Sequence, residues 1–320
     1  MNHKTSNLTV STNDRPYVLM TAAYNEEAFI EGTIKSVLSQ TLLPKKWVIV
    51  SDNSTDRTDA IVEAYAQQHS FIHFVRITRA PGHNFSAKVV ALQKATVAFD
   101  NLEYRFIGNL DADVSLAPTY FEALVAAFER SPRLGVASGY IYERTDGQFR
   151  SRPSNRITSV PHAAQLMRRE CYEAIGGYSA LKYGGEDWQA QICARMNGWD
   201  VEAIPQLPIF HHKPTGAGAN LLRHRFRLGR LDYSFGSHPA FEFVKCLLRF
   251  SERPVVIGAA LRWLGFCWCH LCREPRAVSQ ECVAFLRGEQ TERFWSLFRT
   301  SKSQTTEPAN HPVISERFTN

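Results

Sequence analysis

Short apolar runs alternate with helical patterns along residues 17–142, and this alternation is what most constrains the fold. The apolar runs predict strands, and the segments between them predict helices because their apolar residues recur at helical spacing. The predicted strands are 17–23, 47–52, 72–77, 105–110 and 134–142, and the predicted helices are 28–40, 58–69, 86–98 and 118–130. Such alternation is typical of an α/β fold, with a mainly parallel sheet flanked by helices on both faces.

Polar clusters follow three of the predicted strands directly, at residues 21–27, 52–56 and 111–113. In sheets of this kind, ligands bind beyond the carboxyl ends of the strands. The three clusters should therefore meet at one edge of the sheet. A fourth cluster, GGEDW at 184–188, opens a later predicted helix, and a loop over the site is expected at 143–167. Residues 201–210 contain two prolines, which predicts a short or edge strand.

The strongest of these clusters is Asp111-Ala112-Asp113. Two carboxylates at positions i and i+2 after a buried strand can meet at one cation, or one can bind metal while the other binds a sugar hydroxyl. Carboxylate oxygens favour Mg²⁺ or Mn²⁺ over softer metals. Such an ion can neutralise a diphosphate leaving group. The alternative is an acidic turn that caps the next helix.

The other clusters each have a functional and a purely structural interpretation. Residues 21–27 could hold a base and ribose, although Glu26 and Glu27 could equally just favour the helix dipole. Asp52 could accept a hydrogen bond from a base, or its segment could be only a turn and helix cap. At 184–188, glycines permit close approach to a ligand and a carboxylate could take a proton from a hydroxyl, or the segment could be another cap.

Taken together, these motifs resemble those of the family 2 glycosyltransferases, which have the GT-A fold. TAAYNEE is similar to the opening motif of the family, VIVSDNSTDRT to its second-strand motif, NLDADV to its metal-binding Asp-x-Asp motif, and GGEDWQAQICARMNG, preceded by AIGGYS, to its acceptor-side helix. The resemblance spans about residues 16–212. It implies transfer of a sugar from a nucleotide-sugar donor, with Mg²⁺ or Mn²⁺ as the cofactor.

The resemblance also implies roles for individual residues. Asp187 would be the base that activates the acceptor hydroxyl for an inverting displacement, and Asp113 would bind the metal. Asp111 would face the ribose or sugar. The remaining donor-side residues would be Thr21, Ala22, Tyr24, Glu26, Asp52, Lys88 and Ala112, and the acceptor-side residues would be Gly185, Glu186 and Trp188.

Some positions depart from the pattern of the family or leave alternatives open. Ser51 stands where the family often has the first Asp of a pair. Lys88 or Arg79 could contact phosphate, or each could be a solvated cation. His211 or His212 could supply another metal ligand or touch the diphosphate, and the alternative is a histidine of the core or surface.

Charge and composition divide the chain into parts. Hydrophobic residues make up 44% and charged residues 21%, which is a globular balance. Residues 213–320 contain 16 Lys and Arg against 9 Asp and Glu, so an anionic partner is expected there. The predicted divisions are a flexible N-terminus (1–15), a GT-A catalytic domain (16–215), a basic amphipathic helical extension (216–300) and a disordered tail (301–320).

Within that extension, residues 254–272 are the most apolar stretch of the sequence. We expect an amphipathic helix in the surface of an anionic membrane, with a helix buried on the catalytic domain as the alternative. A true span is disfavoured because Arg262 interrupts the stretch. The odd number of cysteines, seven, favours a reducing compartment with free thiols, and hence a cytoplasmic protein at the inner face of the membrane. No recognised nucleic-acid motif is present, so nucleic acid is not an expected partner.

The sequence therefore predicts an inverting, metal-dependent glycosyltransferase that uses a UDP- or GDP-sugar and extends a lipid-linked or polysaccharide acceptor. A sugar-phosphate nucleotidyltransferase is one alternative, but that class normally opens with a glycine-rich phosphate loop, and TAAYNEEAF contains no glycine. A non-catalytic membrane-bound scaffold with a relict donor site is the other alternative.

Overall fold

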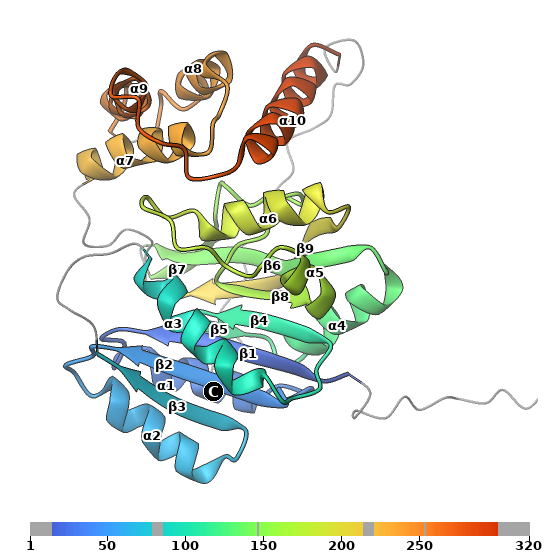
Figure 1. Cartoon of the computed structure of the whole chain (residues 1–320). Coiled ribbons are helices and arrows are strands. Elements are labelled where there is room, and N and C mark those ends of the chain that lie inside the picture. Colours follow the sequence, from blue (N-terminus) through green and yellow to red (C-terminus); the bar gives the residue numbers. More distant parts are fainter. Residues whose placement is uncertain (1–14, 79–85, 146, 214–220, 253, 300–320) are drawn as a thin grey trace, which may run out of the picture.

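A computed structural model describes residues 15–78, 86–145, 147–213, 221–252 and 254–299. Within these residues the chain forms a nine-stranded sheet with the order β3-β2-β1-β4-β8-β6-β9-β5, and β7 pairs with β6 (Figure 1). The strands are β1 (Tyr17–Ala23), β2 (Lys46–Asp52), β3 (Ile72–Ile77), β4 (Phe106–Leu110), β5 (Val114–Leu116), β6 (Leu134–Thr145), β7 (Gln148–Ser151), β8 (Ala164–Arg168) and β9 (Asp200–His211).

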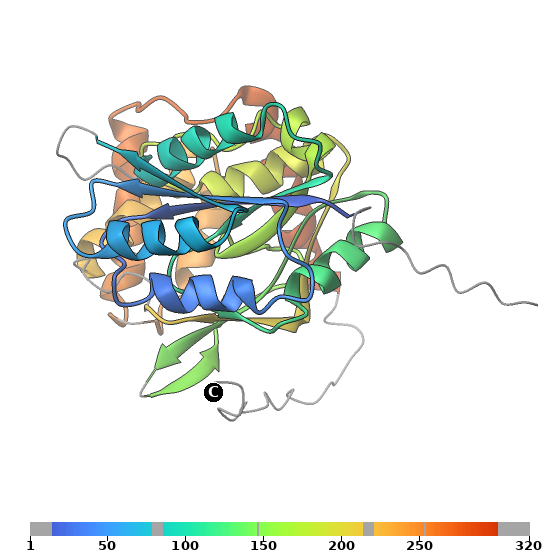
Figure 2. The same cartoon turned by 90° about the horizontal axis from the view of Figure 1, so that it is seen from below.

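Strands β1 to β4 form the parallel half of the sheet, and helices cover both of its faces (Figure 2). Alternate residues of β1 enter different cores: Leu19 packs in the cluster that contains Ile34, and Met20 in the cluster that contains Leu92. Burial on both faces explains why these strands are continuous apolar runs. The helices that flank the sheet are α1 (Ile30–Leu38), α2 (Thr58–Gln68), α3 (Ala87–Thr96), α4 (Tyr120–Arg130), α5 (Arg169–Ala174) and α6 (Glu186–Met196), with a 3₁₀ turn at Val97–Phe99.

The other half of the sheet is mixed. Strand β8 runs antiparallel to both β4 and β6, whereas β9 runs parallel to β6 and antiparallel to β5. The prediction of an α/β fold with a helix-flanked sheet is confirmed, and the strands predicted within residues 17–142 are the four of its parallel half together with β6 of the mixed half.

Two local expectations are wrong. Residues 143–167 are not simply a loop, because β6 continues to Thr145, pairs with β7, and is followed by the start of β8. The segment 201–210 is neither short nor an edge, because β9 has 12 residues and lies between β6 and β5. Its ladder with β6 jumps from Ile204 to Pro208, and this irregularity accommodates the prolines, which cannot donate to a ladder.

The amphipathic helices expected at the C-terminal side are present: α7 (Leu221–Ser234), α8 (Pro239–Leu248), α9 (Ile257–Leu271) and α10 (Gln280–Arg299). Helices α7 and α9 cross at glycines, since a Cβ on Gly229 would lie 1.8 Å from the carbonyl oxygen of Arg262 and one on Gly265 would lie 2.1 Å from that of Phe226. Any side chain there would separate the two helices.

The remaining expectations concern the two ends of the chain, membrane-spanning helices and the cysteines. The flexible N-terminus (1–14 of 1–15), the disordered tail (301–320) and Arg79 lie outside the described residues. In the described part of the chain, every helix is too short or too polar to cross a bilayer. All seven cysteines are unpaired thiols, as the sequence predicts.

Candidate active site

The turn that carries Asp111 and Asp113 connects β4 to β5 and is held by hydrogen bonds to α1. The buried Thr33 hydroxyl lies 2.9 Å from the carbonyl oxygens of both Ala112 and Val114, and it accepts a hydrogen bond from the Val114 N–H at 3.1 Å. The N–H of Asp111 donates a hydrogen bond of 2.7 Å to the carbonyl oxygen of Ala163. These bonds hold the two carboxylates in place relative to the sheet.

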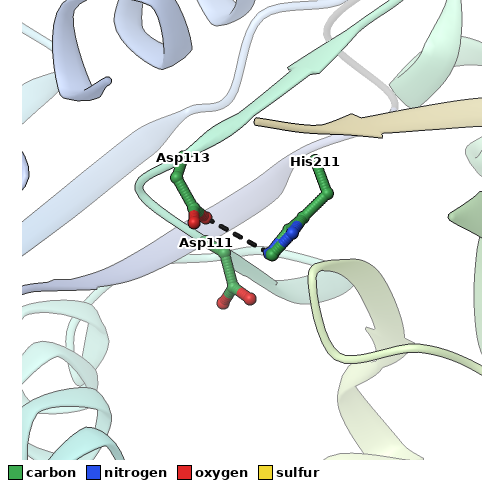
Figure 3. Close-up of side chains that lie close together, drawn as sticks. All are labelled: Asp111, Asp113 and His211. Carbon is green, nitrogen blue, oxygen red and sulfur yellow. Dashed lines mark ion pairs between the residues drawn. The ribbon is translucent and has the colours of Figure 1, made fainter. Parts of the chain in front are cut away.

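Pairing of β5 with β9 brings a histidine to this turn. The ladder sets Val114 opposite His211, and one ligand atom from each of Asp111, Asp113 and His211 lies within 4.8 Å of the others. His211 Nε2 is 3.5 Å from Asp113 Oδ1, and Figure 3 shows the Asp113 carboxylate directed at the imidazole with Asp111 beside it. His212 points elsewhere, because its Nε2 is 2.9 Å from the Ser115 hydroxyl.

The chemistry of this cluster fits a divalent cation. Burial, followed by the charge of Asp111, raises the pKa of Asp113 to about 6, so the two carboxylates are held together against their repulsion. His211 Nδ1 is buried and has no hydrogen-bond partner among the described residues. The two carboxylates are ligands that Mn²⁺ and Mg²⁺ prefer, and the imidazole offers one further nitrogen ligand.

Lys88, in the first turn of α3, links this cluster to the rest of the site. Its Nζ is 2.5 Å from Asp111 Oδ1. Burial works against the charge on Lys88, but Asp111 and then Glu186 outweigh it and raise the pKa of the ammonium group, with a further contribution from Asp187. Burial of Asp111 is likewise outweighed by Lys88, which leaves the pKa of that carboxyl lowered. The ammonium group is therefore electrostatically coupled to both the Asp-x-Asp turn and the start of α6.

At the start of α6, two adjacent carboxyls have opposite properties. Burial opposes the charge of Glu186, but His162, whose Nδ1 lies 3.7 Å away, helps to lower the pKa of Glu186 to about 2. Burial raises the pKa of the neighbouring Asp187, whose Oδ1 accepts a hydrogen bond of 2.8 Å from the Trp188 N–H. The preceding Gly185 has φ +90°, a conformation that glycine adopts without strain. One carboxyl is thus held ionised, and the other binds a proton more readily than usual.

The turns after β1 and β2 are bonded to each other. Asn25 Oδ1 accepts from the Thr55 N–H at 2.8 Å, and the Glu26 N–H donates to the Thr58 hydroxyl at 2.8 Å. Thr21 is buried, and its hydroxyl accepts a 2.9 Å bond from the Trp47 indole. The clusters at 21–27 and 52–56 therefore form one rigid rim. On this rim Tyr24 is 60% exposed, Ala22 is half-buried and Asp52 is buried.

Glu26 connects the rim to the Asp-x-Asp turn. Its Oε1 is 2.8 Å from Lys213 Nζ, while its Oε2 is buried and has no hydrogen-bond partner among the described residues. Burial raises the pKa of Glu26, Lys213 opposes this, and the charges of Asp113 and Asp111 add to the rise. The polar clusters predicted from three strand ends thus meet at one edge of the sheet.

Sequence reasoning missed three residues of this site. Lys213 directly follows the His-His pair at the end of β9, and this position next to two candidate site residues could have identified it. His162 lies in the stretch that was expected to be a loop, and Thr33 belongs to the buried face of α1. Trp188, expected on the acceptor side, stacks on Phe235 after α7 with ring centroids 4.3 Å apart.

Solved structures with a similar fold include proteins that hold nucleotide sugars. A mannosyltransferase from Pyrobaculum calidifontis, solved with GDP-Man and Mn²⁺, aligns over 91% of this chain and 84% of its own with a TM-score of 0.51 at 17% identity. TarS of S. aureus with UDP-GlcNAc aligns over 85% of this chain and 78% of its own, with a TM-score of 0.51 at 16% identity. At these identities the likeness establishes the fold, which is of the GT-A type.

Curated relatives match part of the chain in sequence. An uncharacterised glycosyltransferase, EpsJ of Bacillus subtilis, is 27% identical over 148 residues, which are 45% of this chain and 40% of that protein. The poly-β-1,6-N-acetyl-D-glucosamine synthase of Staphylococcus epidermidis is 31% identical over 121 residues, 37% of this chain and 26% of the synthase. The chain therefore spans well under half the length of these relatives.

A family model covers more of the chain than either relative does. Residues 19–184, just over half of the sequence, match the model described as Glycosyl transferase family 2. This match includes both strand-end turns of the rim, Lys88, the Asp-x-Asp turn and His162. The chain belongs to glycosyl transferase family 2.

Proposed function

We propose that this protein is an inverting, metal-dependent glycosyltransferase that moves a sugar from a UDP- or GDP-sugar to a lipid-linked or polysaccharide acceptor. The observation that carries the proposal is the convergence of Asp111, Asp113 and His211 beside Lys88 at the carboxyl edge of the sheet. The similar mannosyltransferase and TarS structures hold GDP-Man with Mn²⁺ and UDP-GlcNAc, which supports a nucleotide-sugar donor here.

On the donor side, the rim made by the turns after β1 and β2 would receive the nucleoside. Tyr24 is exposed enough to contact a base, and Asp52 is the last residue of β2 at the same edge. The Thr21 hydroxyl is engaged by Trp47, so Thr21 and Ala22 would contribute through their backbone. A Mg²⁺ or Mn²⁺ ion held by Asp111, Asp113 and His211 would supply Lewis-acid neutralisation of the diphosphate.

Lys88 and the start of α6 would serve the transfer itself. The Lys88 ammonium group, kept charged by Asp111, would contact phosphate oxygens near Ala112. Asp187 would accept the proton of the acceptor hydroxyl, and its raised pKa strengthens it as a base. Glu186 stays ionised and would orient the acceptor through hydrogen bonds, with Gly185 allowing close approach. Such an in-line displacement inverts the anomeric centre.

We place the reaction at the cytoplasmic face of a membrane, with the protein bound peripherally. Seven free thiols support a reducing compartment, and the match to a polysaccharide synthase supports a role in the synthesis of cell-envelope polysaccharide.

The test is release of UDP or GDP by the purified chain from a panel of UDP- and GDP-sugars, with and without Mn²⁺ or Mg²⁺. Wild type should release nucleotide only with metal, Asp113→Ala should not, and the exposed Asp100→Ala should match wild type. Nucleotide binding without any turnover would favour the scaffold. Turnover by Asp113→Ala at the wild-type rate would overturn the metal-dependent mechanism.

A further inference from the structure

The outward face of α9 is apolar along its whole length. Ile257, Leu264, Trp268 and Leu271 are between 55% and 78% exposed, and their spacing places them on one side of the helix. The one Asp, Glu, Lys or Arg in α9 is Arg262, which is only 5% exposed. A surface helix of a globular protein normally has charged residues on this side, so the pattern is inverted.

Buried ion pairs fix this orientation of α9. Arg262 Nε donates to Glu242 Oε1 of α8 at 2.8 Å, and its Nη2 donates to Asp232 of α7. Lys245 Nζ completes the group at 2.7 Å from Asp232 Oδ1. Turning α9 to bury its apolar side would leave the buried carboxylates without Arg262, which would be strongly destabilising. The apolar side is therefore held toward solvent.

The exposed apolar surface continues onto α8 and the connection to α9. We call it the α8–α9 face, and its exposed members are Phe243, Leu247, Leu248, Phe250, Val255, Val256, Ile257, Leu264, Trp268 and Leu271. Figure 1 shows α8 and α9 on the side of α7 that faces away from the sheet, so the face forms an outer surface of the protein. Large apolar side chains that are exposed on two adjacent helices and on their connection indicate an interaction site.

We propose that the α8–α9 face docks into the interfacial zone of a bilayer that contains anionic lipids. Arg249 follows the end of α8 and the exposed Arg273 follows that of α9, so cations lie at both ends of the face. The nearby Glu252 is paired with Arg225 and Arg249. An apolar helix side with aromatic residues and flanking arginines is the pattern that binds anionic lipid surfaces.

A second copy of the chain fits this face less well. A two-fold dimer sets the same surface of each copy against its equivalent. Pairing through the α8–α9 face would match the apolar stripes, but it would also bring the basic ends of the two copies together. Anionic headgroups, in contrast, offer opposite charge at the rim and an apolar phase beneath.

Helix α7 connects the docked face to the acceptor side of the site. Arg227 donates to the carbonyl oxygen of Tyr183, and Trp188 stacks on Phe235 after α7. On its other side α7 packs against α9 at Gly229 and Gly265. Docking would therefore hold the turn before Asp187 at a fixed position relative to the lipid surface. Such a position would serve transfer to a lipid-linked acceptor, and this part of the inference rests on the proposed function.

Vesicle flotation with the purified full chain tests the docking. Wild type should float with phosphatidylcholine vesicles that contain phosphatidylglycerol, and less with phosphatidylcholine alone. Leu264→Glu and Trp268→Glu should each weaken partitioning by about tenfold or more, because each places a charge on the inserted side. The matched control is Val97→Glu, at a position on the catalytic domain that is 65% exposed, and it should float like wild type.

Bromine-labelled lipids provide a second readout that does not depend on catalysis. They should quench tryptophan fluorescence of wild type, and Trp268→Phe should still float but lose most of the quenching. Donor hydrolysis by Leu264→Glu should remain at the wild-type level, which separates docking from the proposed transferase activity. Absence of wild-type flotation, equal loss with Val97→Glu, or a dimer that Leu264→Glu converts to monomer would each overturn the proposal.

Discussion

Two regions of this protein bury clusters of charge, and they differ in how those charges are balanced. Between α7, α8 and α9, the carboxyls of Asp232 and Glu242 are matched by Lys245 and Arg262. At the carboxyl edge of the sheet, five carboxyls surround two ammonium groups and two histidines: Glu26, Asp111, Asp113, Glu186 and Asp187 with Lys88, Lys213, His162 and His211. The first cluster is neutral as built, whereas the second has an excess of acid.

The pKa shifts follow this difference. In the helical cluster, the cations overcome burial and lower the pKa of Asp232, although burial and Asp232 raise that of Glu242. At the sheet edge, burial raises the pKa values of Glu26, Asp113 and Asp187, whereas Lys88 and His162 lower those of Asp111 and Glu186. A self-contained cluster fixes the arrangement of helices, while an unbalanced one favours binding of a cation or a proton. Four sets of substitutions test this contrast.

Removal of a carboxylate from the unbalanced cluster should abolish activity without loss of stability. We expect Asp113→Asn to lower metal-dependent nucleotide release by roughly 10³-fold, because one metal ligand is lost. Its melting temperature without metal should equal or exceed that of wild type, since a buried, repelled carboxylate is removed. Steady-state kinetics and thermal unfolding check the two parts, and clear destabilisation would show that Asp113 has a structural role instead.

Removal of a cation from the balanced cluster should instead lower the stability of the fold. Arg262→Met should cost about 3–5 kcal/mol of the free energy of unfolding, because Asp232 and Glu242 stay buried beside one remaining cation. Denaturant titration measures this loss. The double variant Arg262→Met with Glu242→Met should recover part of it, and no recovery would mean that packing rather than charge balance dominates.

Asp187→Asn tests whether a raised pKa at the active site costs stability. A carboxyl whose folded-state pKa is raised binds its proton more tightly in the folded state, so stability falls as pH rises through the folded pKa. The variant should therefore melt higher than wild type at neutral pH, with the difference vanishing in acid. Its turnover should be lost, whereas wild-type kcat/KM should rise with pH as Asp187 ionises. A flat wild-type profile would argue against Asp187 as the base.

The two adjacent histidines should have unequal effects. His212→Ala should lose about 1 kcal/mol of stability with its hydrogen bond to Ser115 and retain turnover. His211→Ala should abolish the rise in melting temperature that Mn²⁺ produces in wild type, because that rise depends on metal affinity. An equal metal response in the two variants would exclude His211 as a ligand.

Much of the fold followed from local pattern where strands are buried on both faces. The run from Tyr17 to Ala23 is apolar throughout because helices cover both sides of β1, and its predicted bounds match those of the structure. Strand β8 was missed because its five residues follow a long polar stretch and acquire their burial only between β4 and β6. The carboxylates of the site could be identified because Glu26, Asp111 and Asp113 follow strands and Glu186 and Asp187 follow a Gly-Gly pair that opens a helix, but His162 and Thr33 carry no such signal.

By itself, the sequence determined the parallel half of the sheet, the polar turns at its edge and the helical character of the C-terminal part, because these depend on the periodicity of neighbouring residues. Tertiary structure alone decided that His211 rather than His212 faces Asp113, since the register between β5 and β9 selects the side of the strand. It also decided that Arg262 points inward, where pairing with Asp232 and Glu242 leaves the opposite side of α9 apolar and exposed. Both outcomes depend on contacts between residues far apart in the chain, which local periodicity does not encode.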